Sequence, residues 1–319
     1  MRYICALLIF INLLYGDAHI FNYHRFDDYR HKNTNISKNN LIKNFEYLKT
    51  HNYEVVPLDK LIATINNGEK IPSNWVVLTV DDGYKSFYEN GFEIFKRYNY
   101  PFTLFIYTEA IEKKYKDFLT LDMIKEISKF GDVQLHSYSH RNLVKMSDEE
   151  IKNDLDMSTK FFEKSLGYKP KCLSYPYGDY SRRVNDIALQ NGFNCILTQN
   201  FGAVSSRHDN GIILDRASFN NETKQNVMLA IEYLDVEWIK PTSFPKDSFI
   251  DNIQATLSDK NINEVNLFIS SYGWHKVDIK DGILNFTLNK PIQKDAFKII
   301  LKVGKKENTN LIIKDEYAK

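Results

Sequence analysis

Short apolar runs alternate with segments of helical periodicity along most of the chain. The clearest run is Val76-Val77-Leu78-Thr79-Val80, bounded by Pro72 and Gly83, which is typical of a strand buried on both faces of a parallel sheet. Further strands are expected at residues 19–24, 53–58, 102–107, 132–135, 171–174, 193–197 and 211–214. Helices are expected at residues 41–48, 61–66, 84–98, 121–130, 182–190 and 223–234, with another beginning at Ser147. This alternation predicts βαβ units, and seven or eight of them in about 215 residues predict a closed or nearly closed barrel.

The pattern changes near Pro241. Apolar and polar residues alternate in segments 265–269, 284–288 and 297–303, which predicts strands with one buried face. Asp281-Gly282 is a hairpin-turn dipeptide between two such segments. The expected fold is therefore an α/β barrel domain over residues 19–240, followed by a small antiparallel β-domain over residues 241–319.

The first eighteen residues have the character of a signal peptide. Arg2 gives a positive start, residues 3–15 are almost wholly apolar, and Gly16-Asp17-Ala18 offers a cleavage site. The apolar stretch is too short for a spanning helix, so we expect an exported protein, periplasmic or extracellular, that is not an integral membrane protein after signal removal. Export would leave Cys172 and Cys195 where a disulfide is permitted, and their spacing leaves open whether they pair.

The charge balance argues against a charged partner. Lys and Arg total 42 against 41 Asp and Glu, for a net charge of +1. Such a chain has no overall field to attract nucleic acid or an acidic membrane surface. A neutral partner is expected.

Candidate chemistry begins at the end of the strand over residues 76–80. Asp81 and Asp82 follow it directly, and adjacent carboxylates at a buried position require a metal ion or an arginine opposite them. His136 and His140 follow the strand that ends at residue 135, and two histidines four apart can bind one cation if the first turn after the strand is helical. Asp82, His136 and His140 would then leave coordination positions open, which is typical of a catalytic metal site.

Other polar residues follow strands of the same predicted sheet. His24 ends the first strand, Pro176 and Tyr177 follow the strand over residues 171–174, and Arg216 follows the strand over residues 211–214. The carboxyl ends of parallel barrel strands open on one face, where active sites are built. We therefore expect these side chains to meet the carboxylates and histidines there.

These residues resemble the polysaccharide deacetylases of carbohydrate esterase family 4 over roughly residues 19 to 235. Thr79-Val80-Asp81-Asp82-Gly83 is similar to the family's T-F-D-D-G motif, and residues 136–140 match its H-[ST]-x-x-H motif. The resemblance implies a distorted (β/α)7-8 barrel in which Asp81 is the catalytic base. It also implies a divalent metal on Asp82, His136 and His140, for which zinc is favoured and cobalt or nickel would serve.

Two departures from the family pattern point to one branch of it. Ser174 stands where the third motif normally has arginine, and the late L-x-x-H motif that usually supplies the general acid is absent. Both features resemble the branch that deacetylates the biofilm polymer poly-β-1,6-N-acetylglucosamine. That resemblance implies His24, in Tyr23-His24, as the acid and Arg216 as a replacement partner of Asp81. It further implies that the backbone N–H of Tyr177, next to Pro176, binds the oxyanion.

Simpler interpretations exist for the weaker residues. His24 could be a hydrogen-bonding residue of the barrel rim, Arg216 could pair with another acid, and Pro176 and Tyr177 could form a turn. His208 and His275 are rival acids. Tyr272 and Trp274 could stack on sugar rings, although we expect them in the core of the small domain.

The expected function is metal-dependent N-deacetylation of a β-linked N-acetylglucosamine polymer, releasing acetate, with the exopolysaccharide favoured. One alternative keeps this chemistry but acts on peptidoglycan. The other is a carbohydrate-binding module that has lost activity with the usual arginine and late histidine.

Overall fold

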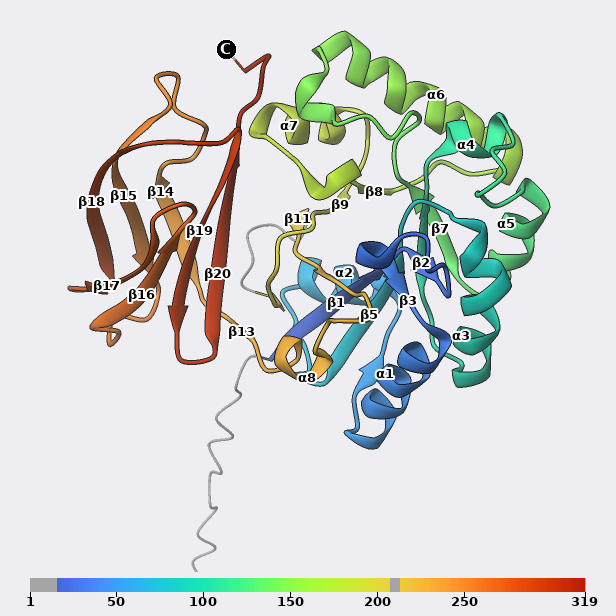
Figure 1. Cartoon of the computed structure of the whole chain (residues 1–319), viewed down its shortest axis with the longest axis horizontal. Coiled ribbons are helices and arrows are strands. Elements are labelled where there is room, and N and C mark those ends of the chain that lie inside the picture. Colours follow the sequence, from blue (N-terminus) through green and yellow to red (C-terminus); the bar gives the residue numbers. More distant parts are fainter. Residues whose placement is uncertain (1–15, 207–212, 319) are drawn as a thin grey trace, which may run out of the picture.

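A mainly parallel sheet organises the first part of the computed structural model, which describes residues 16–206 and 213–318 (Figure 1). Its strands follow the order β10-β1-β5-β6-β7-β8-β9-β11. They are β10 (Val204–Ser205), β1 (Asp17–Tyr23), β5 (Trp75–Val80), β6 (Thr103–Ile106), β7 (Asp132–Leu135), β8 (Cys172–Ser174), β9 (Cys195–Leu197) and β11 (Ile213–Leu214). Since β11 pairs with β9 while β12 (Ala217–Ser218) pairs with β1, residues 213–218 connect the two edges. The nearly closed barrel expected from the sequence is confirmed.

Helices cover the outside of this sheet. They are α1 (Lys38–Thr50), α2 (Leu58–Asn66), α3 (Phe92–Tyr98), α4 (Thr108–Glu112), α5 (Leu121–Ile127), α6 (Asp148–Leu166), α7 (Arg182–Gln190) and α8 (Gln225–Met228). Short elements complete the barrel and its rim: β2 (Arg25–Phe26), β3 (Asn35–Ile36), β4 (Glu54–Val55), η1 (Lys32–Thr34), η2 (Phe87–Gly91), η3 (Leu143–Lys145) and η4 (Pro176–Gly178). Every residue of β5 is buried, as expected for a strand covered on both faces.

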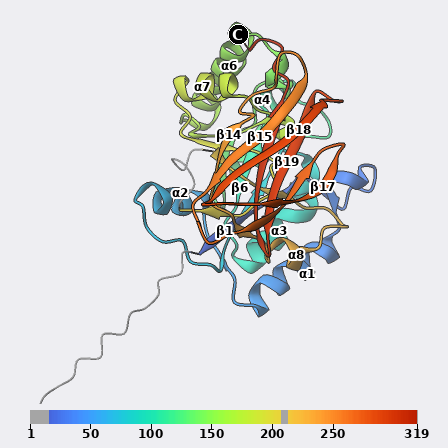
Figure 2. The same ribbon diagram turned by 90° about the vertical axis from the view of Figure 1, so that its left-hand side faces the viewer.

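Two further sheets pack on each other after the barrel, and Figure 2 views them with the barrel behind. One has the order β13-β20-β19-β16-β17 and the other β14-β15-β18. Their bounds are β13 (Glu232–Tyr233), β14 (Val236–Lys240), β15 (Phe249–Leu257), β16 (Glu264–Ile269), β17 (Gly273–Asp278), β18 (Ile283–Pro291), β19 (Ala296–Val303) and β20 (Lys306–Ile313). The predicted turn at Asp281-Gly282 is confirmed, with φ of 53° and 75°.

Some sequence-based expectations differ from the structure here. The helix expected over residues 223–234 is wrong beyond Met228, because Glu232–Tyr233 pairs with β20 and so extends the five-stranded sheet. The C-terminal sheets thus begin at Glu232 rather than at residue 241. Trp274, expected in the core, is 55% exposed, whereas Tyr272 is half-buried against the core of the two sheets.

The described part of the chain begins at residue 16, within the predicted signal peptide. The signal-peptide prediction falls mostly on residues 1–15, which lie outside the described residues, while Asp17 and Ala18 belong to β1. Among the described residues, no helix has the length and apolar character needed to cross a membrane. Cys172 and Cys195 are neighbours on β8 and β9, and both are free thiols.

Candidate active site

Asp82, His136 and His140 converge at the carboxyl ends of β5 and β7. Their candidate ligand atoms all lie within 4.8 Å of one another. Asp82 Oδ1 is 3.1 Å from His136 Nε2 and 3.0 Å from His140 Nε2. Neither approach has the geometry of a hydrogen bond, so Asp82 Oδ1 has no hydrogen-bond partner among the described residues. A buried acceptor facing two imidazole nitrogens fits a divalent cation, and the mixed nitrogen and oxygen donors suit zinc or a similar ion.

The surroundings of this cluster leave one side open. The side chains of His136 and Asp82 are buried, whereas that of His140 is 23% exposed. His136 Nδ1 lies 2.8 Å from the carbonyl oxygen of Ser174. Because a carbonyl only accepts, Nδ1 carries the proton, and the Nε2 lone pair is free to bind a metal. An open, oriented ligand set favours a catalytic site over a structural one.

The conformation of the loop after β7, which brings His136 and His140 together, differs from the one predicted from the sequence. The sequence analysis assumed a helical turn between them, but residues 136–142 form no helix. Instead, φ is 66° at Ser137 and 54° at His140. Asp82, with φ 73°, and Tyr177, with φ 64°, share this left-handed conformation. Such backbone is unfavourable for residues with a Cβ, and its concentration at one site is typical of functional centres.

Asp81 is held by a dense network beside the metal-ligand cluster. Its Oδ2 accepts hydrogen bonds from Asn22 Nδ2 (3.0 Å), Ser174 Oγ (3.1 Å) and Arg216 Nη2 (2.8 Å). Its Oδ1 accepts from Arg216 Nη1 (2.9 Å), which leaves this oxygen with spare acceptor capacity. Burial alone would raise the pKa of Asp81, but the Arg216 charge and its neighbours outweigh burial and lower that pKa. Asp81 is therefore an ionised acceptor at neutral pH.

Arg216 is fully buried, and all five of its N–H groups are used. Nε donates to Thr198 O (2.8 Å), Nη1 to Thr79 Oγ1 (3.1 Å) and Asp81 Oδ1, and Nη2 to Asp81 Oδ2 and Ser174 Oγ (2.7 Å). The structure thus brings Arg216 to Asp81 as a bidentate partner. Ser174, which stands where the family motif has arginine, links Arg216 to Asp81 and orients His136 through its carbonyl.

His24 lies at the end of β1 and is 8% exposed. Burial lowers its pKa, although the charges of Asp82 and Asp81 act in the opposite direction. Of its two rivals, His208 lies outside the described residues. His275 lies in β17 of the C-terminal sheets, with its ring 5.0 Å from that of Phe286.

Pro176 and Tyr177 form the start of the short helix η4 after β8. The Tyr177 side chain is 58% exposed, and its ring centroid is 5.0 Å from that of His140. Tyr177 therefore lies at the open side of the metal-ligand cluster, while the neighbouring Pro176 is buried.

Two residues of the site were missed by the sequence analysis. Asn22 binds Asp81, and its signal was an amide directly after the apolar pair Ile20-Phe21 of the first strand. Asp154 lies on the buried face of α6, four residues before Ser158, and is 4% exposed. Its carboxylate accepts hydrogen bonds from the backbone N–H groups of Tyr138 (2.7 Å) and Ser139 (3.1 Å). Asp154 therefore fixes the loop that carries both histidines.

We expect Asp154→Asn to weaken metal binding by roughly 10-fold to 100-fold. Losses of this size are typical when a residue that holds metal ligands in position through hydrogen bonds is replaced. An amide can present only one acceptor oxygen, so one backbone N–H of the strained loop loses its partner. Metal affinity measured by competition with a chelator checks this. Asp156→Asn, on the exposed side of α6, is the matched control. Unchanged affinity in Asp154→Asn would contradict the role.

Comparison with known proteins finds similarity over part of the barrel. Residues 68–196 match the family model for polysaccharide deacetylase. It is 32% identical over 162 residues to the poly-beta-1,6-N-acetyl-D-glucosamine N-deacetylase of Staphylococcus aureus (strain MSSA476). That match covers 46% of this chain and 55% of the relative, so the chain spans about half the length of the curated relative.

Solved structures share the fold. The Streptococcus pyogenes deacetylase PplD in complex with acetate superposes with a TM-score of 0.61 and 21% identity, covering 67% of this chain and 96% of that one. IcaB from Ammonifex degensii gives a TM-score of 0.58 and 21% identity, covering 64% and 92%. At these identities the likeness establishes the barrel architecture alone.

Proposed function

We propose that the chain is a metal-dependent N-deacetylase of a β-linked N-acetylglucosamine polymer, with a β-1,6-linked exopolysaccharide favoured over peptidoglycan. The observation that carries the proposal is the Asp81–Arg216 ion pair, which is buried directly beside an open Asp82-His136-His140 ligand set. The named Staphylococcus aureus relative supports the choice of polymer. The proposed protein is exported, and its catalytic unit is the barrel, with the C-terminal sheets as a second domain.

A divalent cation on Asp82, His136 and His140 would supply a water of lowered pKa and polarise the acetamide carbonyl. Asp81 would accept the proton of that water at Oδ1, because its Oδ2 already accepts three hydrogen bonds. The backbone N–H of Tyr177 would donate to the oxygen that gains charge. His24 would protonate the departing amine. The products are acetate and a glucosamine unit that becomes cationic.

Acetate release tests the proposal. The purified chain, supplied with zinc, cobalt or nickel, is incubated separately with poly-β-1,6-N-acetylglucosamine and with peptidoglycan, and acetate is measured. We expect release from the exopolysaccharide and its loss on chelation. Acetate release from peptidoglycan alone would show that peptidoglycan, and not the exopolysaccharide, is the substrate. Polymer binding without acetate release under any metal would favour an inactive binding module.

For His24→Ala we expect a fall in kcat on the order of 10²-fold or more, with metal retained, because general acid catalysis typically contributes this much. Burial lowers the pKa of His24, so the protonated form is lost as pH rises through that lowered value. The wild-type rate should therefore fall toward alkaline pH. In the His24→Ala variant, this decrease of the rate with rising pH should be absent. An unchanged rate and pH profile would exclude His24 as the acid. His51→Ala, on an exposed helix end, controls for loss of an imidazole.

A further inference from the structure

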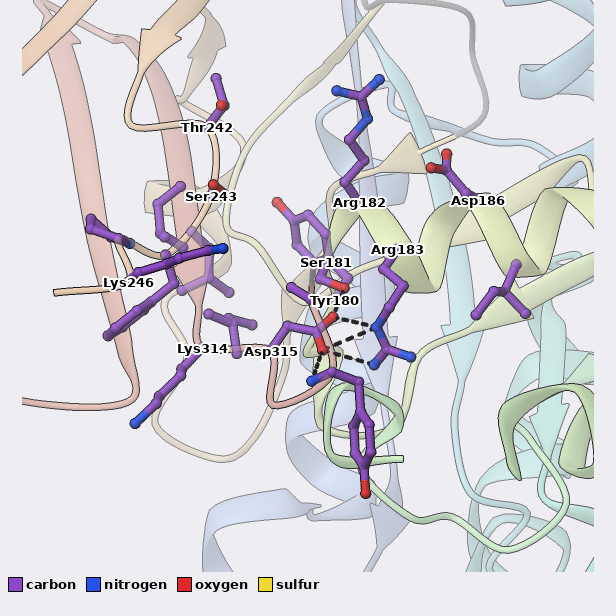
Figure 3. A pocket seen from close by; sticks show the side chains of 18 of the residues that line it. Tyr180, Ser181, Arg182, Arg183, Asp186, Thr242, Ser243, Lys246, Lys314 and Asp315 are labelled. Atoms are coloured by element: carbon purple, nitrogen blue, oxygen red, sulfur yellow. Dashed lines mark hydrogen bonds and ion pairs between the residues drawn. The ribbon is translucent and has the colours of Figure 1, made fainter. Parts of the chain in front are cut away.

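A cavity of about 820 Å³ lies between α7 of the barrel and the C-terminal sheets (Figure 3). Its volume is within the ~300–1,000 Å³ of typical small-molecule sites. Aromatic rings line it together with hydroxyl and amide groups, including Tyr180, Ser181, Thr242, Phe244, Asn310 and Tyr317. We call it the interdomain cavity. None of the residues placed in the active site lines it.

The interdomain cavity nevertheless adjoins the active site through two loops. Tyr177, at the open side of the metal-ligand cluster, is three residues before Tyr180 in the cavity wall, and three residues span at most about 11 Å. The loop after His140 likewise continues to Asp148, another wall residue. Asn142 Nδ2 donates to Asp179 Oδ2 at 2.6 Å, which ties the two loops together. A polymer held over His140 and Tyr177 would thus reach the cavity within a short distance.

The wall of the interdomain cavity is preorganised. Arg183 of α7 forms ion pairs with Asp315 at 2.8 Å and with Asp148 at 2.7 Å, and Ser181 Oγ also donates to Asp315. The side chain of Asp315 is only 3% exposed. The interactions around Asp315, drawn with dashed lines in Figure 3, join the end of the C-terminal sheets to the start of α7. The cavity therefore exists without a ligand to shape it.

The charge of the lining is positive. Its described residues include five cationic side chains against three acidic ones, and one of the five, Lys314, also lies 3.8 Å from Asp295 outside the lining, which leaves a surplus of about one positive charge. Two of those acids, Asp148 and Asp315, are already paired with Arg183. Arg182 and Lys246 are exposed lining residues, and Lys246 extends toward α7 (Figure 3). This surplus repels an ammonium group but tolerates a neutral acetamide.

We propose that the interdomain cavity binds the stretch of polymer next to the sugar being deacetylated, and that it selects sugars that still carry their acetyl groups. This inference rests on the proposed function and extends it. The reaction turns each neutral sugar into a cation, so a neighbouring site with positive charge disfavours polymer that has already been processed. Deacetylation would then be spaced along the chain rather than complete.

The test compares β-1,6-linked N-acetylglucosamine oligomers of increasing length, fully acetylated or carrying glucosamine outside the reacting unit. For the wild type, kcat/KM for acetate release should rise with length, and long acetylated oligomers should be preferred roughly five-fold over partly deacetylated ones. In Arg182→Gln/Lys246→Gln this preference should largely disappear while activity on the dimer is unchanged. Added salt should reduce the wild-type preference. Lys49→Gln/Lys125→Gln, on exposed faces of α1 and α5, is the matched control.

Binding to the metal-free wild-type protein, measured by calorimetry, separates this inference from the proposed function. Tighter binding of long acetylated oligomers than of partly deacetylated ones supports the cavity's role even if no acetate is released, in which case the proposed function alone fails. Length-independent binding and turnover would overturn the inference. So would equal behaviour of the cavity variant and the wild type.

Discussion

His140→Ala should abolish acetate release and leave the protein unable to retain a stoichiometric divalent metal. His140 supplies one of three ligand atoms that lie within 4.8 Å of one another, and two protein ligands do not hold zinc tightly in an open site. Its side chain is 23% exposed, so its removal perturbs packing less than removal of the buried His136 would. Metal content after dialysis and acetate release from the exopolysaccharide are the two measurements.

The control for this substitution is a solvent-accessible histidine outside the site. His51→Ala removes an imidazole from the end of α1 and should keep both metal and activity. Asp82→Ala and His136→Ala should behave like His140→Ala, because each removes one of the same three ligands. If His140→Ala bound metal with wild-type stoichiometry and affinity, the site would have to be assigned to other residues.

The residues of this site could be predicted largely because active sites of parallel barrels form at the carboxyl ends of the strands. Side chains at the carboxyl ends of these strands meet on one face, so Asp81, Asp82, His136 and Arg216 could be expected together although they are far apart in the sequence. The Asp281-Gly282 turn and the helix start at Ser147 were also predictable, because each depends on local backbone chemistry alone.

Other features depend on contacts that no local pattern encodes. Residues 229–234 have helical periodicity, yet Glu232–Tyr233 is a strand because β20 offers it an edge. The loop between His136 and His140 keeps its positive φ values because Asp154, from α6, binds its backbone. Trp274 is exposed because its position on β17 faces away from the core, which depends on strand register.

Asp81→Asn is the second substitution with a large expected effect. We expect kcat to fall on the order of 10³-fold while metal is retained, because Asp81 is not a member of the ligand set and an amide cannot accept the proton from water. Ser174→Ala is the matched control, since it removes the hydrogen bonds of Ser174 Oγ with Asp81 and with Arg216 but leaves the carboxylate and its arginine in place. Its effect on kcat should be much smaller. Near-normal activity of Asp81→Asn would exclude Asp81 as the base.

The same substitution should also destabilise the fold, because it leaves the Arg216 guanidinium buried without a counter-charge. Removing one partner of a buried ion pair typically costs about 3–5 kcal/mol. The loss should depend on pH with a definite sign. The pKa of Asp81 is lowered in the folded state, so its contribution to the free energy of unfolding is complete above ~3.9, the ordinary pKa of aspartate, and is lost as pH falls through the lowered value. Denaturant unfolding of metal-free wild type and Asp81→Asn should therefore differ most near neutral pH and converge in acid. A difference that stays constant across this range would mean that Asp81 is not held ionised by Arg216, and the argument for a poised base would fail with it.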